Sequence, residues 1–275
     1  MGNDLITLDD PIEILPGLHR LGATVPTLGR LSWAPAQVVE PLPMNVYVAL
    51  SDASALVIDT GVRALYPAML DQITELVGDR ELSVLVTRND PEAMGGVGFL
   101  LPQLEPSFLF YYGGGSILEW VWDERGGPGA AGDLFDTTEV ANPPEIELDQ
   151  SRALRVFRTP LAVLNTVWAY DPQTRTLFTS DGLGYVAAAS SGQVVDPAGD
   201  VDAQRAFAFL GARFDWVDRI NSPRLADELR ALLVPLEVDN LAPSHGVVVR
   251  GRAAVDRYLE TVLGTLVPAS VTPPA

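Results

Sequence analysis

The sequence predicts an α/β fold in which helices cover sheets. Segments rich in β-branched and aromatic residues alternate with segments whose apolar residues recur at helical spacing, and both halves of the chain show this order. The 275 residues, of which 47% are hydrophobic, are enough to bury a large core. No short repeat and no linker-like stretch divides the chain, so we expect one domain over residues 1–275.

In the first half of the chain, turn and helix signals separate short β-rich segments. Pro16-Gly17 marks a turn within the strand region 12–22. Apolar residues at helical spacing predict a helix over residues 64–78, and a proline in its first turn supports a second helix over residues 91–104. Strands are expected at residues 44–50, 55–59, 82–87, 107–112 and 117–122, before a glycine-rich loop at 124–133.

In the second half of the chain, most of the expected strands precede the expected helices. The turn at residues 171–174 joins two of its strands. The expected strands cover residues 145–148, 153–158, 163–170, 176–180 and 240–243. The expected helices cover residues 201–219, 223–236 and about 251–264.

The net charge limits the kinds of molecule that the protein is expected to bind. Lys plus Arg total 18 and Asp plus Glu total 36, which gives a formal net charge of −18. Such a field repels phosphate backbones and anionic lipid, so neither nucleic acid nor a membrane is an expected partner. No apolar run is long enough to span a bilayer, and the acidic N-terminus lacks a basic signal region, which predicts a cytoplasmic protein.

Two residue counts restrict the chemistry further. The absence of cysteine excludes disulfides, thiolate metal sites, iron–sulfur clusters and cysteine nucleophiles. The two histidines, His19 and His245, are too few for a histidine-rich metal site. We interpret His19, in the first strand region, as structural.

The segment at residues 83–96 combines a buried strand, a polar loop and a helix with a glycine pair. Its loop carries Arg88, Asp90 and Glu92 where a strand ends, a common position for active-site residues in α/β folds. Paired carboxylates can bind a hard cation or transfer protons. Alternatively, Asp90 caps the following helix and Glu92 lies in its first turn. Both interpretations stay open.

This segment resembles the metal-binding motif of metallo-β-lactamase-fold proteins, Thr-His-x-His-x-Asp-His followed by Gly-Gly. It is more similar to that of flavodiiron proteins, His-x-Glu-x-Asp-His with a proline before the aspartate. At the four ligand positions, this chain has residues of other types. They are Arg88 for His, Asp90 for Glu, Glu92 for Asp and Ala93 for His.

Three further landmarks support the resemblance. The strand pair that ends in Asp59-Thr60-Gly61 resembles the family's strand pair, in which this aspartate is a buried support for the site loop. Residues 177–184 are similar to the flavodiiron Leu-Phe-Ser-x-Asp-x-Phe-Gly, whose metal-bridging aspartate corresponds to Asp181. Residues 241–246 are similar to its Ala-Pro-Ser-His-Gly segment, whose ligand histidine corresponds to His245.

The resemblance covers roughly residues 10–265 and implies an αββα metallo-β-lactamase-like sandwich. The family's middle histidine-bearing segment aligns with residues 159–164, which contain no histidine. A flavodoxin domain is not expected. The resemblance also implies a homodimer, and the aromatic stretch 108–112 belongs to the core, a dimer surface or a hydrophobic pocket.

The substitutions imply that at least one of the family's two metal positions is lost. Arg88 is permanently charged and could neutralise Asp90 and Asp181 without any cation. The pocket of Arg88, Asp90, Glu92, Asp181 and His245 would then hold no cofactor and bind a small molecule or a protein. His245 with a carboxylate partner is the candidate for metal-free acid–base chemistry in such a pocket, and Asp90 is the candidate general base if a metal ion is bound.

An alternative keeps a single metal ion. Two carboxylates and one imidazole, from Glu92, Asp181 and His245, can hold Fe, Mn or Zn. That ion would serve an oxidoreductase or a hydrolase. The sequence leaves the metal-free and mononuclear interpretations open.

Overall fold

The structure is a computed structural model, and it describes residues 8–27, 41–111, 136–139, 145–185, 195–196, 201–220 and 222–267. Within these residues, the first sheet contains seven strands in sequence order. They are β1 (Ile12–Leu15), β2 (Leu18–Val25), β3 (Leu42–Leu50), β4 (Ser54–Ile58), β5 (Glu81–Val86), β6 (Phe108–Tyr111) and β7 (Asp136–Glu139).

The second sheet also has seven strands, in the order β12-β14-β13-β11-β10-β9-β8. They are β8 (Glu145–Glu147), β9 (Ala153–Arg158), β10 (Val167–Asp171), β11 (Thr176–Ser180), β12 (Val195–Asp196), β13 (Asn240–Pro243) and β14 (Val248–Arg250). The six described α-helices are α1 (Tyr66–Val77), α2 (Pro91–Met94), α3 (Val97–Leu104), α4 (Ala203–Arg213), α5 (Ser222–Leu233) and α6 (Arg252–Thr265).

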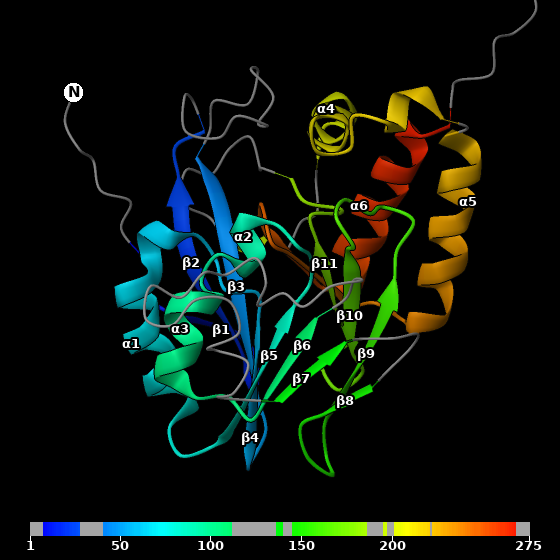
Figure 1. Cartoon of the computed structure of the whole chain (residues 1–275). Coiled ribbons are helices and arrows are strands. Elements are labelled where there is room, and N and C mark those ends of the chain that lie inside the picture. The colour runs from blue at the N-terminus through cyan, green and yellow to red at the C-terminus, as the bar shows by residue number, and fades with distance from the viewer. Residues whose placement is uncertain are drawn as a thin grey trace, which may run out of the picture.

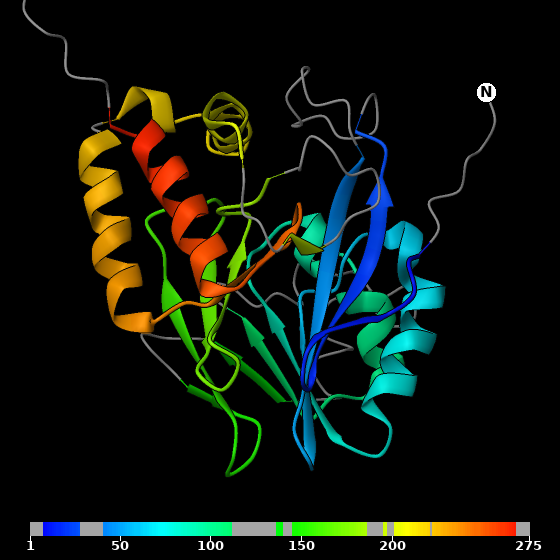
Figure 2. The same cartoon turned by 180° about the vertical axis from the view of Figure 1, so that it is seen from behind.

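The two sheets face each other and carry helices on their outer sides, with α1 and α3 on one side and α5 and α6 on the other (Figure 1). The view from behind shows the same four layers (Figure 2). One apolar cluster joins the sheets, and two others join each sheet to its helices. Strands covered on both faces are rich in apolar residues on both sides, as in the fully buried β4 and β10. The predicted αββα sandwich is confirmed.

Strand direction places the candidate residues at one end of the sandwich. β4 runs parallel to β5 in the first sheet, and β11 runs parallel to β13 in the second. Their carboxyl ends therefore open toward the same region, where Figure 1 shows α2 and α4. The loops that follow these four strands carry Asp59, Arg88, Asp181 and His245.

The prediction of a single helix over residues 91–104 is wrong. The helix breaks at Gly95-Gly96 into α2 and α3. A Cβ atom on Gly95 would clash with the Pro91 carbonyl oxygen and the Tyr66 hydroxyl, and one on Gly96 would lie 2.8 Å from Thr60 Cβ. The Gly96 amide also donates to Thr60 Oγ1 at 2.9 Å. The glycine pair thus lets the Asp59-Thr60-Gly61 loop pack directly against the break.

Other boundaries also differ from the predictions. The strand expected over residues 163–170 begins only at Val167, because Leu164 and Asn165 have left-handed φ angles of 52° and 58° that a strand cannot accommodate. Two expected helices end early and continue as 3-10 turns, at Val217–Arg219 and Val234–Leu236. The expected strand 117–122 and loop 124–133 lie outside the described residues. No helix among the described residues has the length and apolar character to cross a membrane.

Candidate functional site

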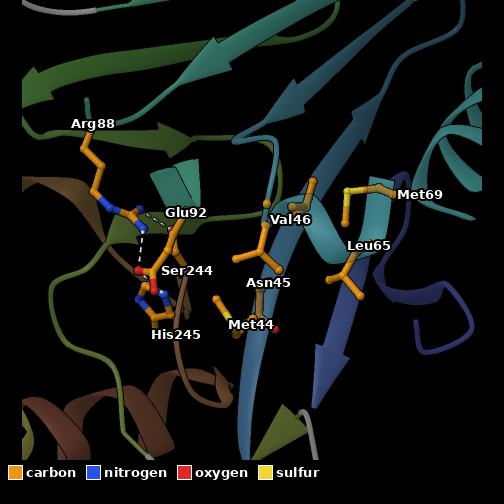
Figure 3. Close-up of a pocket in the computed structure, with 11 residues that line it drawn as sticks. Met44, Asn45, Val46, Leu65, Met69, Arg88, Glu92, Ser244 and His245 are labelled. Carbon is orange, nitrogen blue, oxygen red and sulfur yellow. Dashed lines mark hydrogen bonds and ion pairs between the residues drawn. The ribbon is translucent and has the colours of Figure 1, made fainter. Parts of the chain in front are cut away.

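The five residues predicted to form a pocket meet at the carboxyl ends of β5, β11 and β13. Figure 3 shows Arg88, Glu92 and His245 pointing toward one another, with Ser244 beside them. They come from segments far apart in the sequence, so the convergence is a property of the fold. The structure brings together all five predicted side chains, including Asp90 and Asp181.

Asp90 performs both tasks that the sequence left as alternatives. Its backbone is extended at the N-terminus of α2, and Oδ1 accepts hydrogen bonds from the amides of Glu92 at 3.0 Å and Ala93 at 2.9 Å. Its Oδ2 accepts from Arg88 Nε at 2.7 Å. Because both oxygens are engaged, Asp90 can act as a general base only if the cluster rearranges.

Arg88 lies at the centre of the cluster with 1% of its side chain exposed. Its Nε atom is 2.7 Å from Asp90 Oδ2 and 2.9 Å from Asp181 Oδ2, so the predicted contacts with both carboxylates are present. Its Nη1 atom donates to Ser180 Oγ at 3.1 Å and Ser244 Oγ at 3.2 Å. Burial disfavours the charge, but the surrounding carboxylates outweigh burial and raise the pKa of Arg88.

A second guanidinium enters the cluster from α4, and sequence reasoning missed it. Arg213 is the last residue of that helix, and its Nη2 atom lies 2.6 Å from Asp181 Oδ2 and 2.7 Å from Asp90 Oδ2. The same atom lies 3.4 Å from Glu92 Oε2. The only signal was the excess of carboxylates, which requires positive partners without saying where in the chain they lie.

His245 bridges two carboxylates through its two ring nitrogens. Nε2 lies 3.0 Å from Glu92 Oε2, and Nδ1 lies 3.0 Å from Asp181 Oδ1. Two ionised carboxylates favour a doubly protonated, cationic imidazole, and the contact between Nδ1 and Asp181 Oδ1 is a close ion pair without the alignment of a hydrogen bond. Burial lowers the pKa of His245, but the two carboxylates outweigh burial and raise it. Burial likewise opposes ionisation of Glu92, but His245 outweighs it and lowers the pKa of Glu92 to about 2.

This arrangement predicts a bell-shaped dependence of stability on pH. The raised pKa of His245 contributes stability that is present below its ordinary pKa of 6.5 and is lost as the pH rises through the folded-state pKa. The lowered pKa of Glu92 contributes stability that is present above 4.5 and is lost as the pH falls toward 2. Urea unfolding across pH should therefore give greatest stability between these limits, with an acid loss on the order of 3 kcal/mol from Glu92.

The control for this pH profile is Glu75→Gln, which removes an exposed carboxylate of α1. It should keep the wild-type profile, whereas Glu92→Gln should reduce the acid limb and leave the part that comes from Asp181, whose pKa Arg88, His245 and Arg213 lower against the effect of burial. An unchanged acid limb in Glu92→Gln would show that Glu92 is not the group that titrates.

Asp59 supports the cluster through hydrogen bonds to the neighbouring loops. It has a left-handed φ of 62° and is 2% exposed. Its carboxylate accepts hydrogen bonds from the amide and hydroxyl of Thr87 and from Ser244 Oγ, all at 2.8 Å. Burial raises the pKa of Asp59. The residue thereby ties the loop after β4 to the loops that carry Arg88 and His245.

The loop of His245 is also held from β3. Asn45 Nδ2 donates to the carbonyl oxygens of Pro243 and Gly246, both at 2.8 Å. Arg20, which is fully buried, orients Asn45 by donating from Nε to Oδ1 at 2.8 Å. These contacts make Asn45 of β3 a brace for the loop that carries His245.

Two other features that the sequence singled out, His19 and the aromatic stretch 108–112, are part of the packed sheets. His19 lies on β2 opposite Val48, and burial lowers its pKa. In the aromatic stretch, Leu109 belongs to the core beneath α1 and α3, while Phe108 and Phe110 stack on the other face with ring centroids 5.9 Å apart.

The residues present do not fit a binuclear metal centre. The family motif needs several imidazoles, and this cluster has only His245, while residues 159–164 supply none. The Oδ2 atoms of Asp90 and Asp181, which face the centre, each contact both guanidiniums. A cation there would meet two fixed positive charges at short range. The cavity beside the cluster is about 10 Å³, lined in part by Arg88, Glu92 and His245.

The side chains of the cluster come closer to the geometry of a site for one metal ion than to that of a binuclear centre. One ligand atom each from Glu92, Asp181 and His245 lies within 4.8 Å of the others. However, the two carboxylates contact opposite nitrogens of the imidazole, and a single ion can be bound by only one of those nitrogens. One of the side chains would have to reorient to complete such a site.

Comparisons with known proteins agree with this architecture. The sequence profile described as ODP family beta lactamase matches residues 42–246, from β3 to the loop of His245. No curated protein sequence matches the chain significantly. Similar solved structures include rubredoxin oxygen:oxidoreductase from Desulfovibrio gigas, with a TM-score of 0.70 and 14% identity over 93% of this chain and 61% of that one.

Two other solved structures give similar values. A mutant flavo di-iron protein from Thermotoga maritima has a TM-score of 0.68 and 15% identity over 95% of this chain and 62% of that one. The flavodiiron protein from Giardia intestinalis has a TM-score of 0.64 and 17% identity over 93% and 60%. The chain thus spans less than two thirds of these structures. At such identities the likeness establishes the fold, and the metallo-β-lactamase-like, flavodiiron-like core is confirmed.

Proposed function

Because this chain belongs to the ODP family of beta lactamases, we propose that it is a member without the binuclear metal centre, repurposed for binding or metal-independent chemistry. The observation that carries the proposal is the pair of guanidiniums on Asp90 and Asp181. Arg88 and Arg213 supply the positive charge that a carboxylate cluster requires, so the cluster is neutralised without a metal ion.

The packing of the site supports the same proposal. A cavity of about 10 Å³ has room for roughly one water molecule. A small-molecule substrate would reach Asp90 or His245 only after a side chain or helix moves. We therefore propose that the cluster mainly fixes the site loops and that any ligand is bound after Arg213 and α4 shift.

The alternative is a mononuclear metal-dependent oxidoreductase or hydrolase. The proximity of donor atoms from Glu92, Asp181 and His245 favours it. Two carboxylates and an imidazole suit Fe, Mn or Zn. In that case the ion would polarise a substrate oxygen or activate a bound water.

Elemental analysis of the full chain, purified without chelators, separates the two proposals. The metal-free proposal predicts substoichiometric Fe, Mn and Zn in the wild type and the same content in His245→Ala. A stoichiometric metal that disappears in His245→Ala would instead establish the mononuclear site. Folding of both proteins is verified by circular dichroism.

Chelation provides an independent check. A protein whose folded state holds a metal loses stability when the metal is removed, because binding free energy adds to folding free energy. We expect the melting temperature to be the same with and without EDTA. A lower melting temperature in EDTA that returns on addition of one metal would contradict the proposal.

A further inference from the structure

A groove lies between α5 and α6, the two helices that Figures 1 and 2 show side by side on the outer side of the second sheet. Its volume is about 470 Å³, and none of the residues that line it belongs to the carboxylate cluster. The apolar part of its lining consists of Leu233, Val234, Val238, Leu259 and Leu263. Apolar side chains inside an open groove indicate a surface that another molecule can cover.

Val234, in the turn that follows α5, is the most exposed large apolar residue in the part of the chain that the structure describes, with 77% of its surface exposed. Isolated exposed apolar residues are common, but Val234 also lines the groove. Leu233, Val238 and Leu263, by contrast, are at most 8% exposed. One face of the protein therefore carries both an exposed apolar side chain and an apolar hollow, and such a face can be complementary to a second copy of itself.

The charged residues that line the groove carry no net charge. They are two arginines, Arg230 and Arg252, and two carboxylates, Asp256 and Glu260. The whole chain has a formal net charge of −18, so two copies repel each other over most of their surface. A strongly basic partner would be attracted to the acidic remainder and would gain little at a patch without net charge. A second copy, in contrast, meets the least repulsion at this patch.

The two signs also lie on opposite sides of the groove. Arg230 belongs to α5, and its exposed pair with Asp227 of the same helix contributes little, so it can be exchanged for another partner. Glu260 belongs to α6, and its carboxylate forms no ion pair with any described residue. A two-fold axis along the groove places α5 of each copy opposite α6 of the other. Arg230 of each copy would then face Glu260 of the other copy.

We propose that the groove between α5 and α6 is the interface of a two-fold symmetric homodimer, in which Val234 of each copy enters the groove of the other and Arg230 pairs with Glu260 across it. The resemblance implied a homodimer without indicating a surface, whereas the shape and charges of this face indicate one. The nine residues that line the groove are fewer than the roughly 20–30 that each partner contributes to a standard interface. We therefore expect a weak dimer, with a Kd on the order of micromolar.

Sedimentation equilibrium of the full chain over a series of concentrations measures the Kd of the dimer. The wild type should show a monomer–dimer equilibrium. Val234→Glu should raise the Kd by at least about tenfold, because it places a charge inside the apolar groove of the other copy. Since Val234 is exposed in the single chain, this variant should fold as the wild type does, and circular dichroism verifies that it does.

A charge reversal tests the pairing across the interface. Arg230→Glu should weaken the dimer because it sets two carboxylates against each other, and the double variant Arg230→Glu/Glu260→Arg should return the Kd to within about threefold of the wild-type value. Arg224→Glu is the control, because it changes the net charge of α5 by the same amount at an exposed residue outside the groove. It should leave the Kd close to that of the wild type.

Three results would overturn the inference. The first is a wild type that stays monomeric at concentrations up to about 1 mM. If this monomer binds the amphiphilic dye anilinonaphthalene sulfonate and Leu259→Arg abolishes that binding, the groove belongs to a small amphiphilic ligand instead. The second is a dimer that Val234→Glu and Arg230→Glu leave unchanged, which would place the contact on another surface. The third is a double variant that stays as weak as Arg230→Glu. None of these variants alters the carboxylate cluster, so the metal-free proposal stands or falls separately.

Discussion

Arg88→Met is expected to lower the free energy of unfolding by about 3–5 kcal/mol. The substitution keeps an unbranched apolar stem but removes the guanidinium that Asp90 and Asp181 contact at 2.7 and 2.9 Å. Both carboxylates are almost completely buried, so water cannot replace the lost partner. Leaving a buried charge uncompensated costs far more than losing an exposed pair. Urea unfolding followed by circular dichroism measures the change.

The matched control for Arg88→Met is Arg224→Met. Arg224 pairs with Glu228 at 2.9 Å, but the two side chains are 76% and 47% exposed. Its loss should change the unfolding free energy by less than about 1 kcal/mol. If Arg88→Met unfolded at the same urea concentration as Arg224→Met, the buried guanidinium would not be the counter-charge of the cluster.

The convergence at the site was expected mainly from the resemblance, which assigns Asp181 and His245 to the family's ligand positions, while the strand end before Arg88 marked the first loop. Asp181 and His245 lie directly after short, fully buried strands, and parallel neighbours end at the same edge of a sheet. The substitution of a permanent cation at the Arg88 position also indicated its chemistry. Position and charge together were enough to expect the Arg88–Asp181 contact, and the structure contains it.

Arg213 could not be predicted in the same way. Helical periodicity indicates which face of α4 is buried, but it does not indicate which distant loop meets the end of the helix. A basic residue in the last turn is also what the helix dipole favours in any helix, so it carries no specific signal. Likewise, the left-handed residues Leu164 and Asn165 delay the start of a segment that the local pattern assigns wholly to a strand. Tertiary packing determines both features.

Asp181→Asn is expected to have the second large effect, also about 3–5 kcal/mol. Asp181 contacts Arg213 at 2.6 Å, Arg88 at 2.9 Å and His245 at 3.0 Å, and its side chain is fully buried. The amide keeps the size of the carboxylate but removes the charge that three cationic groups share. Asp239→Asn is the control, because Asp239 is 30% exposed and pairs with Arg175 at the surface.

The double variant Arg88→Met/Asp181→Asn decides whether the cluster is one unit. Once Asp181 is neutral, Arg88 has less negative charge to compensate, so its removal should cost less than it does in the wild type. We expect the two losses to fall short of additivity by about 0.5–3 kcal/mol. Strictly additive losses would mean that each residue acts independently. The charges of Arg88 and Asp181 would then not compensate each other, and the basis for a metal-free cluster would be lost.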